Sequence, residues 1–223
     1  MTDSRLVVSP QIPDREGLPD EEIPEGMRPD ARETWPSREL IESFLGDFDF
    51  ELRPGETIHV DTEEQARAAR RFRDVLGRFA TGITVVTAVS GGEPVGMTCQ
   101  SFMSVSLDPP LVLFSPAKTS RAWPAIQRSG RFCVNFLAAD QEPLSNTMAS
   151  RGLDKFAGLG WTATPETGSP LLDGALGYVD CTIHAVHETG DHYVVIGRVQ
   201  DLDATRDGEP LLFYRGEYRT TGD

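Results

Sequence analysis

PVGMTCQSFMSVSLDPPLVLFSPAKTSRAW, residues 94–123, is the stretch that decides the expected fold. Between Ser101 and Leu107 apolar side chains alternate with serines, which predicts a strand with one face that packs and one that presents hydroxyl groups. The segment SPAKTSR at 115–121 follows with two cations and three hydroxyl groups. We expect it at the start of a helix, where unpaired backbone N–H groups favour a phosphate.

The chain around this stretch is rich in short strands. Alternating apolar residues and turn signals predict strands at 82–89, 132–137, 176–187, 192–203 and 210–214. The two longest are joined by a hairpin turn, Glu188-Thr189-Gly190-Asp191. Apolar residues spaced by three to four predict a helix from 61 or 62 to 79, and we expect two further helices at 120–129 and 141–150. Many short strands with few helices favour a mostly antiparallel barrel of the α+β class over a βαβ sheet.

The N-terminal part differs in charge from the rest of the chain. Residues 1–64 carry eighteen acidic residues and six arginines, net −12, whereas residues 65–223 carry seventeen acidic and fifteen basic residues, net −2. Residues 39–48 predict a short helix with an apolar side, which either packs on the domain or a second subunit or belongs to a solubilising tail. We therefore divide the chain into an acidic, Pro-rich extension at 1–60, partly disordered with that short helix, and a domain at 61–223.

Charge and hydropathy exclude several classes of protein. A nearly neutral domain offers no basic stripe for nucleic acid, and no apolar run approaches the roughly 20 residues that span a bilayer. Because the N-terminus lacks the pattern of a signal peptide, we expect a cytoplasmic protein that binds neither nucleic acid nor membrane. The three cysteines are widely spaced, which predicts buried thiols, and no spacing typical of zinc ligands occurs, so we expect no metal.

Several motifs together resemble one known family. The pattern T-x-x-S-F-x-S-V-S-L-x-P-P-L-V-L at 98–113, K-x-S-R at 118–121 and R-F-C-V-N at 131–135 is similar to the flavin reductase-like, FMN-binding split-barrel family. DKFAG at 154–158, GDH at 190–192 and PLLFYRG at 210–216 follow in that family's order, so the resemblance covers about residues 67–220. It implies an antiparallel split β-barrel with peripheral helices and an N-terminal extension. The chain most resembles the reductase component of two-component aromatic hydroxylases of steroid-ring degradation.

The resemblance implies a flavin site on the quoted stretch. Lys118, Ser120 and Arg121 would hold the flavin phosphate, and Lys155 would border the flavin. FMN is the expected flavin, with FAD as the alternative. Cys99 stands where the family more often has a small residue. The implied flavin-binding residues are Val95, Gly96, Met97, Thr98, Gln100, Ser101, Ser115, Pro116, Ala117, Lys118, Ser120, Arg121 and Lys155.

A nicotinamide site is implied beside the hairpin turn. By resemblance, His192 of the GDH motif would be the catalytic residue, positioning the carboxamide of NADH or NADPH rather than acting as a base, because hydride transfer needs none. Tyr214 and Arg215 would shape the same pocket. No GxGxxG follows a strand, so we expect shallow binding of the dinucleotide without a Rossmann unit.

The function that the resemblance implies is NAD(P)H-dependent flavin reduction by a homodimer. Hydride would pass from nicotinamide C4 to flavin N5, and reduced FMN or FAD would be supplied to a separate monooxygenase. Two alternatives stay open: an FMN-retaining oxidoreductase or oxygenase with its own substrate, and a non-catalytic flavin carrier or sensor. Flavin retained through purification would favour either alternative, whereas NADH oxidation that scales with free FMN would favour the reductase.

Overall fold

The structure is a computed structural model that describes residues 63–150 and 154–222. The extension expected at 1–60, with its helix at 39–48, lies outside the described residues. No helix in the described ranges is long and apolar enough to cross a bilayer. The elements in chain order are α2 (Glu63–Leu76), β1 (Thr81–Gly82), β2 (Thr84–Ser90), β3 (Glu93–Cys99), β4 (Met103–Leu107), β5 (Pro110–Phe114), α3 (Trp123–Ser129), β6 (Arg131–Phe136), η3 (Ala139–Gln141), α4 (Glu142–Ala149), β7 (Trp161–Ala163), β8 (Pro170–Leu172), β9 (Gly177–Thr189), β10 (His192–Ala204), β11 (Leu212–Tyr214) and β12 (Glu217–Arg219).

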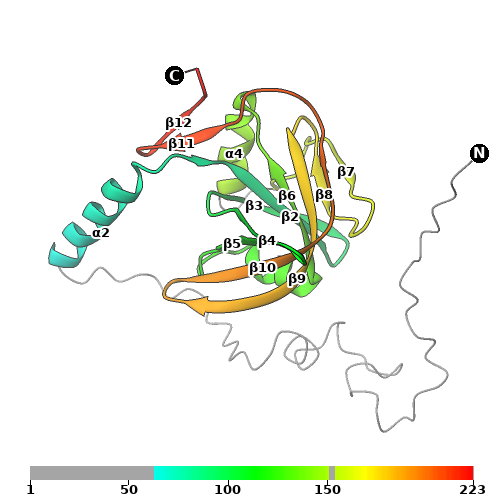
Figure 1. The fold of residues 1–223 in the computed structure, drawn as a ribbon, viewed down its shortest axis with the longest axis horizontal. Coiled ribbons are helices and arrows are strands. Elements are labelled where there is room, and N and C mark those ends of the chain that lie inside the picture. Colours follow the sequence, from blue (N-terminus) through cyan, green and yellow to red (C-terminus); the bar gives the residue numbers. More distant parts are fainter. Residues whose placement is uncertain (1–62, 151–153, 223) are drawn as a thin grey trace, which may run out of the picture. The chain divides into compact units, whose positions relative to one another are not determined.

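Antiparallel strands dominate the domain (Figure 1). The main sheet has seven strands in the order β3-β2-β6-β9-β10-β5-β4, and two smaller sheets have the orders β1-β11-β12 and β7-β8. The long hairpin of β9 and β10, orange in Figure 1, pairs Thr189 with His192 at its tip and Gly177 with Ala204 at its base. The predicted hairpin and the predicted mostly antiparallel class with peripheral helices are therefore confirmed.

Helix α2 begins close to the predicted position and ends earlier. Glu63 and Glu64 lie in its first turn, where carboxylates complement the helix dipole. The helix stops before Gly77, whose N–H donates to the carbonyl of Arg73 at 2.7 Å and whose carbonyl accepts from the N–H of Arg215 at 2.8 Å. Its apolar residues are mostly exposed: Phe72, Val75 and Leu76, followed by Phe79 just beyond the helix.

Aromatic packing fixes α3 against the main sheet. The Phe114 ring on β5 contacts Trp123 of α3 edge-on, with centroids 5.9 Å apart, and Phe132 of β6, with centroids 5.0 Å apart. All three rings are buried. Gly197 on β10 leaves room for Phe132, because a Cβ at this position would lie 2.4 Å from its Cζ. This core fixes the start of α3 and therefore the loop that leads into it.

Two local expectations on the quoted stretch are wrong. Helix α3 begins at Trp123 rather than at residue 120, because the Ser120 hydroxyl accepts the N–H of Trp123 at 3.2 Å and a proline follows at 124. The SPAKTSR segment is therefore the loop before the helix. The apolar face of β4 does not pack within the described chain, since Met103 is 57% and Leu107 91% exposed on a terminal strand of the sheet.

The cysteines agree with the prediction made from their spacing. Cys99, Cys133 and Cys181 are all free and buried. Burial raises the pKa of each of these thiols, because a thiolate is poorly solvated in the core. They are therefore apolar packing residues in the folded chain.

Candidate functional site

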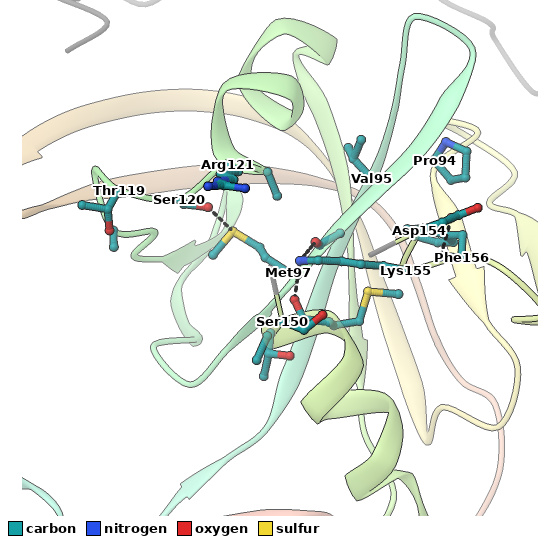
Figure 2. Close-up of a pocket in the computed structure, with 16 residues that line it drawn as sticks. Pro94, Val95, Met97, Thr119, Ser120, Arg121, Ser150, Asp154, Lys155 and Phe156 are labelled. Carbon is teal, nitrogen blue, oxygen red and sulfur yellow. Dashed lines mark hydrogen bonds between the residues drawn. The ribbon is translucent and has the colours of Figure 1, made fainter. Parts of the chain in front are cut away.

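A cavity of about 560 Å³ opens beside β3 (Figure 2). Its walls come from β3, from the loop before α3, from the C-terminal end of α4 and from the loop that precedes β7. The volume lies in the range of small-molecule sites. The lining residues are Pro94, Val95, Gly96, Met97, Thr98, Ala117, Thr119, Ser120, Arg121, Ala122, Met148, Ala149, Ser150, Asp154, Lys155 and Phe156.

Strand β3 supplies the wall on which the other elements pack. The Thr98 hydroxyl donates to the carbonyl of Ser145 on α4 at 2.6 Å, which fastens that helix to the strand. A Cβ at Gly96 would lie 3.1 Å from the Met148 sulfur and 3.4 Å from Cζ of Phe156. Glycine therefore allows α4 and the Phe156 loop to approach the strand closely.

The loop before α3 presents hydroxyl groups and a cation to the cavity. The Ser120 hydroxyl lies 3.6 Å from the Met97 sulfur and caps the first turn of α3. Thr119 and Arg121 are exposed neighbours that line the same end. The Arg121 guanidinium makes no hydrogen bond or ion pair with any other described residue. This part of the cavity wall can therefore bind an anion without first breaking a pair with another described residue.

Lys155 and Arg121 approach Met97 from opposite sides (Figure 2). The Lys155 ammonium group donates to the carbonyl of Gly96 at 3.2 Å and to the carbonyl of Met148 at 2.6 Å. The side chain is partly buried, and this burial lowers the pKa of the amine. Lys155 thus joins β3 to the end of α4 and places a poorly solvated positive charge in the cavity wall.

Lys118, expected as a phosphate ligand, is engaged elsewhere. Its ammonium group forms an ion pair with Glu188 on β9 and lies 5.9 Å from the centroid of the Tyr193 ring. It is not a lining residue of the cavity. Sequence alone could not reveal this pair, because Glu188 is seventy positions away along the chain.

His192 lies next to the cavity loop rather than in the cavity wall. Its backbone forms an isolated bridge with Ala117, and the neighbouring Tyr193 N–H donates to the carbonyl of Pro116 at 2.9 Å. The imidazole Nδ1 lies 2.8 Å from a carboxylate oxygen of Asp191. This hydrogen bond lowers the pKa of Asp191. The hairpin tip therefore carries an oriented, half-exposed histidine to the rim of the site.

Several other predicted flavin residues are not brought into the cavity. The Ser101 hydroxyl accepts from the Ser115 N–H at 2.9 Å and donates to the Ser115 carbonyl at 3.1 Å. These hydrogen bonds join the β3–β4 loop to the end of β5. Gln100 is exposed and Pro116 is buried. The predicted residues outside the cavity lining are Gln100, Ser101, Ser115, Pro116 and Lys118.

Tyr214 and Arg215, expected beside His192, line a different pocket. This second pocket, of about 690 Å³, also includes Leu212 and Glu217 from the small sheet. Arg215 occupies the tight turn between β11 and β12 with a φ of 53°. The β11–β12 turn is joined to the residue after α2, because the N–H of Arg215 donates to the carbonyl of Gly77. That Tyr214 and Arg215 shape one nicotinamide pocket with His192 stays a prediction.

The cavity also contains residues that the sequence did not single out. They are Pro94, Thr119, Ala122, Met148, Ala149, Ser150, Asp154 and Phe156. Asp154 and Phe156 flank Lys155 in the DKFAG motif and could have been included with it. Met148, Ala149 and Ser150 carry no local signal, since only the packing of α4 on β3 brings them to the site.

The residues present fit a flavin nucleotide. Val95, Met97 and Phe156 offer apolar surface for a planar ring, and the hydroxyl groups and guanidinium at 119–121 suit a phosphate. Polar and apolar side chains thus line the same cavity, and polar groups of this kind fix the orientation of a ligand in small-molecule sites. The donor set holds cations and hydroxyl groups rather than metal ligands, and no cluster of three or more metal-binding side chains occurs in the described ranges.

Comparison with known proteins identifies the family. The family model described as the flavin reductase-like domain matches residues 76–222. The chain belongs to this family, and its class is that of oxidoreductases that reduce flavin. The match begins at the last residue of α2, so the antiparallel sheets and the whole cavity lie within it.

Individual relatives agree with this class. The chain is 56% identical over 149 residues to HsaB, the reductase subunit of a flavin-dependent monooxygenase of Rhodococcus jostii, covering 67% of this chain and 76% of the relative. It is 44% identical over 165 residues to SmoA, an FMN reductase (NADH) of Agrobacterium fabrum, covering 74% and 91%. The predicted resemblance to reductase components of two-component monooxygenases is confirmed.

Solved structures show the same fold. A homologue of nitrilotriacetate monooxygenase component B from Mycobacterium thermoresistibile matches with a TM-score of 0.68 and 54% identity, covering 70% of this chain and 88% of that one. An NADH:FAD oxidoreductase of Streptomyces globisporus, solved with NAD and FAD fragments, matches with a TM-score of 0.65 and 38% identity, covering 69% and 92%. The predicted fold of the flavin reductase type is confirmed.

Proposed function

We propose that the cavity beside β3 binds FMN and that the protein uses NADH to reduce it for a separate monooxygenase. The observation that carries the proposal is the composition of the cavity wall. The loop before α3 contributes hydroxyl groups and Arg121, the loop before β7 contributes Lys155, and apolar side chains of β3 lie in the same wall. The NADH-dependent FMN reductase and the monooxygenase reductase subunit among its relatives support the choice of flavin, reductant and partner. FAD is the alternative flavin, because the cavity is open at its rim.

Each part of the site has a distinct role in the proposal. Ser120 and Arg121 hold the phosphate, and Val95 and Met97 pack against the ring. Thr98 acts indirectly by holding α4 in place. When bound, the flavin supplies the atom that accepts the hydride. The protein contributes orientation and charge, since the transfer needs no base.

His192 is proposed to position the nicotinamide at the rim. Asp191 holds the imidazole through the 2.8 Å contact at Nδ1, so Nε2 is the ring nitrogen that would meet a carboxamide. The backbone bridge to Ala117 keeps the ring near the cavity loop. NADH binding through such a half-exposed contact is transient, which suits an enzyme whose flavin also exchanges.

Steady-state kinetics test this function. The purified protein should oxidise NADH at a rate that saturates with added free FMN, and dilution should remove its flavin. Flavin that stays bound after extensive dialysis, with NADH oxidation unaffected by added FMN, would instead favour an oxidoreductase that retains its cofactor. Flavin binding without any NADH oxidation would favour a carrier or sensor.

Assembly and location complete the proposal. The apolar side chains of Phe72, Val75 and Phe79 are 64%, 56% and 76% exposed, which is unusual for a monomer and supports burial in a homodimer. Three free buried thiols are in keeping with a cytoplasmic location. The division into an extension at 1–60 and a domain at 61–223 stays part of the proposal, supported by the start of the family match at 76. Light scattering at several protein concentrations tests the dimer.

A further inference from the structure

The ammonium group of Lys155 has hydrogen-bonding capacity left for a ligand. An ammonium has three N–H donors. Among the described residues, two acceptors use these donors, the carbonyl of Gly96 on β3 and the carbonyl of Met148 in the last turn of α4. Lys155 lines the cavity, so its remaining donor and its charge are available to a molecule bound there.

No acidic side chain in the described part of the chain balances the charge of Lys155. Three lining residues carry charged side chains, namely Arg121, Asp154 and Lys155. Asp154 turns a carboxylate oxygen to the N–H of Phe156 at 3.1 Å, and no carboxylate of a described residue pairs with Lys155. Partial burial lowers the pKa of the Lys155 amine, which means that its positive charge is poorly solvated. An anionic group on a ligand would relieve that cost.

Two cations on opposite sides of Met97 favour a ligand with two anionic centres (Figure 2). A phosphate beside Ser120 and Arg121 is one of them. The reaction itself creates the other. A hydride brings two electrons and one hydrogen from nicotinamide C4 to flavin N5, which leaves NAD⁺ and a reduced ring that carries one negative charge without any proton uptake. That charge is shared by the N1 and C2 carbonyl edge of the ring.

We propose that Lys155 is a ligand selective for the reduced flavin, donating a charged hydrogen bond to the anionic edge of the ring and only weakly contacting the oxidised ring. The inference rests on the proposed flavin site. A preplaced charge stabilises the product and the transition state more than the ground state. Lys155 is then a specificity-determining residue for the redox state of the flavin, whereas Arg121 recognises the phosphate in both states.

Binding measurements with two flavins in two redox states test this assignment. Lys155→Gln removes the charge but keeps a donor for the two carbonyl groups, and Arg121→Gln is the matched loss of one positive charge. Anaerobic titrations would give the Kd of oxidised and reduced FMN and riboflavin. For Lys155→Gln we expect reduced FMN and reduced riboflavin to bind about tenfold more weakly, as for loss of a charged hydrogen bond. The Kd values of oxidised FMN and oxidised riboflavin should change little. The midpoint potential of bound FMN should fall by about 30 mV, the equivalent of tenfold for two electrons.

The controls separate this inference from the proposed function. Arg121→Gln should weaken FMN in both redox states and leave riboflavin unchanged, and Lys155→Arg should keep the preference for reduced flavin. Equal weakening of oxidised and reduced FMN by Lys155→Gln, with riboflavin unaffected, would make Lys155 a phosphate ligand and overturn the inference alone. Unchanged binding of FMN and riboflavin in both redox states would also overturn the inference, because Lys155 would then serve only to join β3 to α4. Failure of the wild-type protein to bind any flavin would overturn the proposed function itself.

Discussion

Replacing Arg121 by alanine should weaken FMN binding strongly, whereas replacing Lys118 should barely change it. The Arg121 guanidinium lines the cavity and has no hydrogen-bond or ion-pair partner among the described residues. A hydrogen bond to a charged group contributes roughly 1.5–3 kcal/mol. Arg121→Ala should therefore raise the Kd of FMN by about ten- to a hundredfold.

Lys118 provides the matched control because its loss removes the same charge. Its ammonium group pairs with Glu188, and the two side chains are 21% and 55% exposed. An ion pair with this much solvent contact contributes about 1 kcal/mol or less to the free energy of unfolding, so losing this pair in Lys118→Ala should destabilise the fold only slightly. Without a contact to the cavity, the Kd of FMN should rise by less than about threefold, which corresponds to under about 0.7 kcal/mol.

Fluorescence quenching of FMN and riboflavin measures both effects. Because riboflavin lacks the phosphate, Arg121→Ala should leave its Kd nearly unchanged. Equal weakening of FMN by the two variants would show that long-range charge, not a direct contact of Arg121, governs binding. A larger effect of Lys118→Ala would mean that Lys118 exchanges Glu188 for the phosphate, and the assignment drawn from the cavity would be refuted.

Three further changes test other parts of the account. His192→Ala should raise the KM for NADH or slow flavin reduction in stopped-flow traces while the Kd of FMN stays nearly the same; weakened FMN binding would show that the residue is misassigned. Gly197→Ala should lower the free energy of unfolding in urea by about 1–3 kcal/mol, because its Cβ would lie 2.4 Å from Cζ of Phe132. Gly82→Ala is the control, because no atom lies within 4 Å of its Cβ, and it should change the free energy of unfolding little. Burial raises the pKa of Cys133, so its contribution to stability should be constant below about pH 9 and be lost as the pH rises above that value, where the unfolded thiol ionises. Cys133→Ala should flatten that alkaline loss, and an unchanged pH profile would contradict the burial argument.

Local patterns were sufficient for most of the fold. Alternating residues and the Gly-Asp turn gave the β9–β10 hairpin within two residues of its observed ends, since both signals act between neighbours in the chain. The start of α3 was misplaced, because Ser120 acts as a cap in front of the helix rather than as its first turn. The packing expected for Met103 on β4 failed for a different reason. The alternation of apolar and polar residues predicts a strand, but it does not show that this strand lies at the edge of the sheet.

The site was predictable only where family motifs mark it. The motif residues of β3, Arg121 and Lys155 do line one cavity. Tertiary packing determines the other lining residues. The packing of α4 on β3 places Met148 in the cavity wall, and Lys118 forms an ion pair with Glu188 outside it. Such contacts join residues forty to seventy positions apart and leave no periodic signal in the sequence.

A crystal structure of the protein with FMN tests the central claim most directly. The account predicts the ring against Val95 and Met97, the phosphate within hydrogen-bonding distance of Ser120 and Arg121, and the Lys155 ammonium at the edge of the ring. FMN found instead in the pocket of Tyr214 and Arg215, or with its phosphate turned toward Lys155, would contradict it.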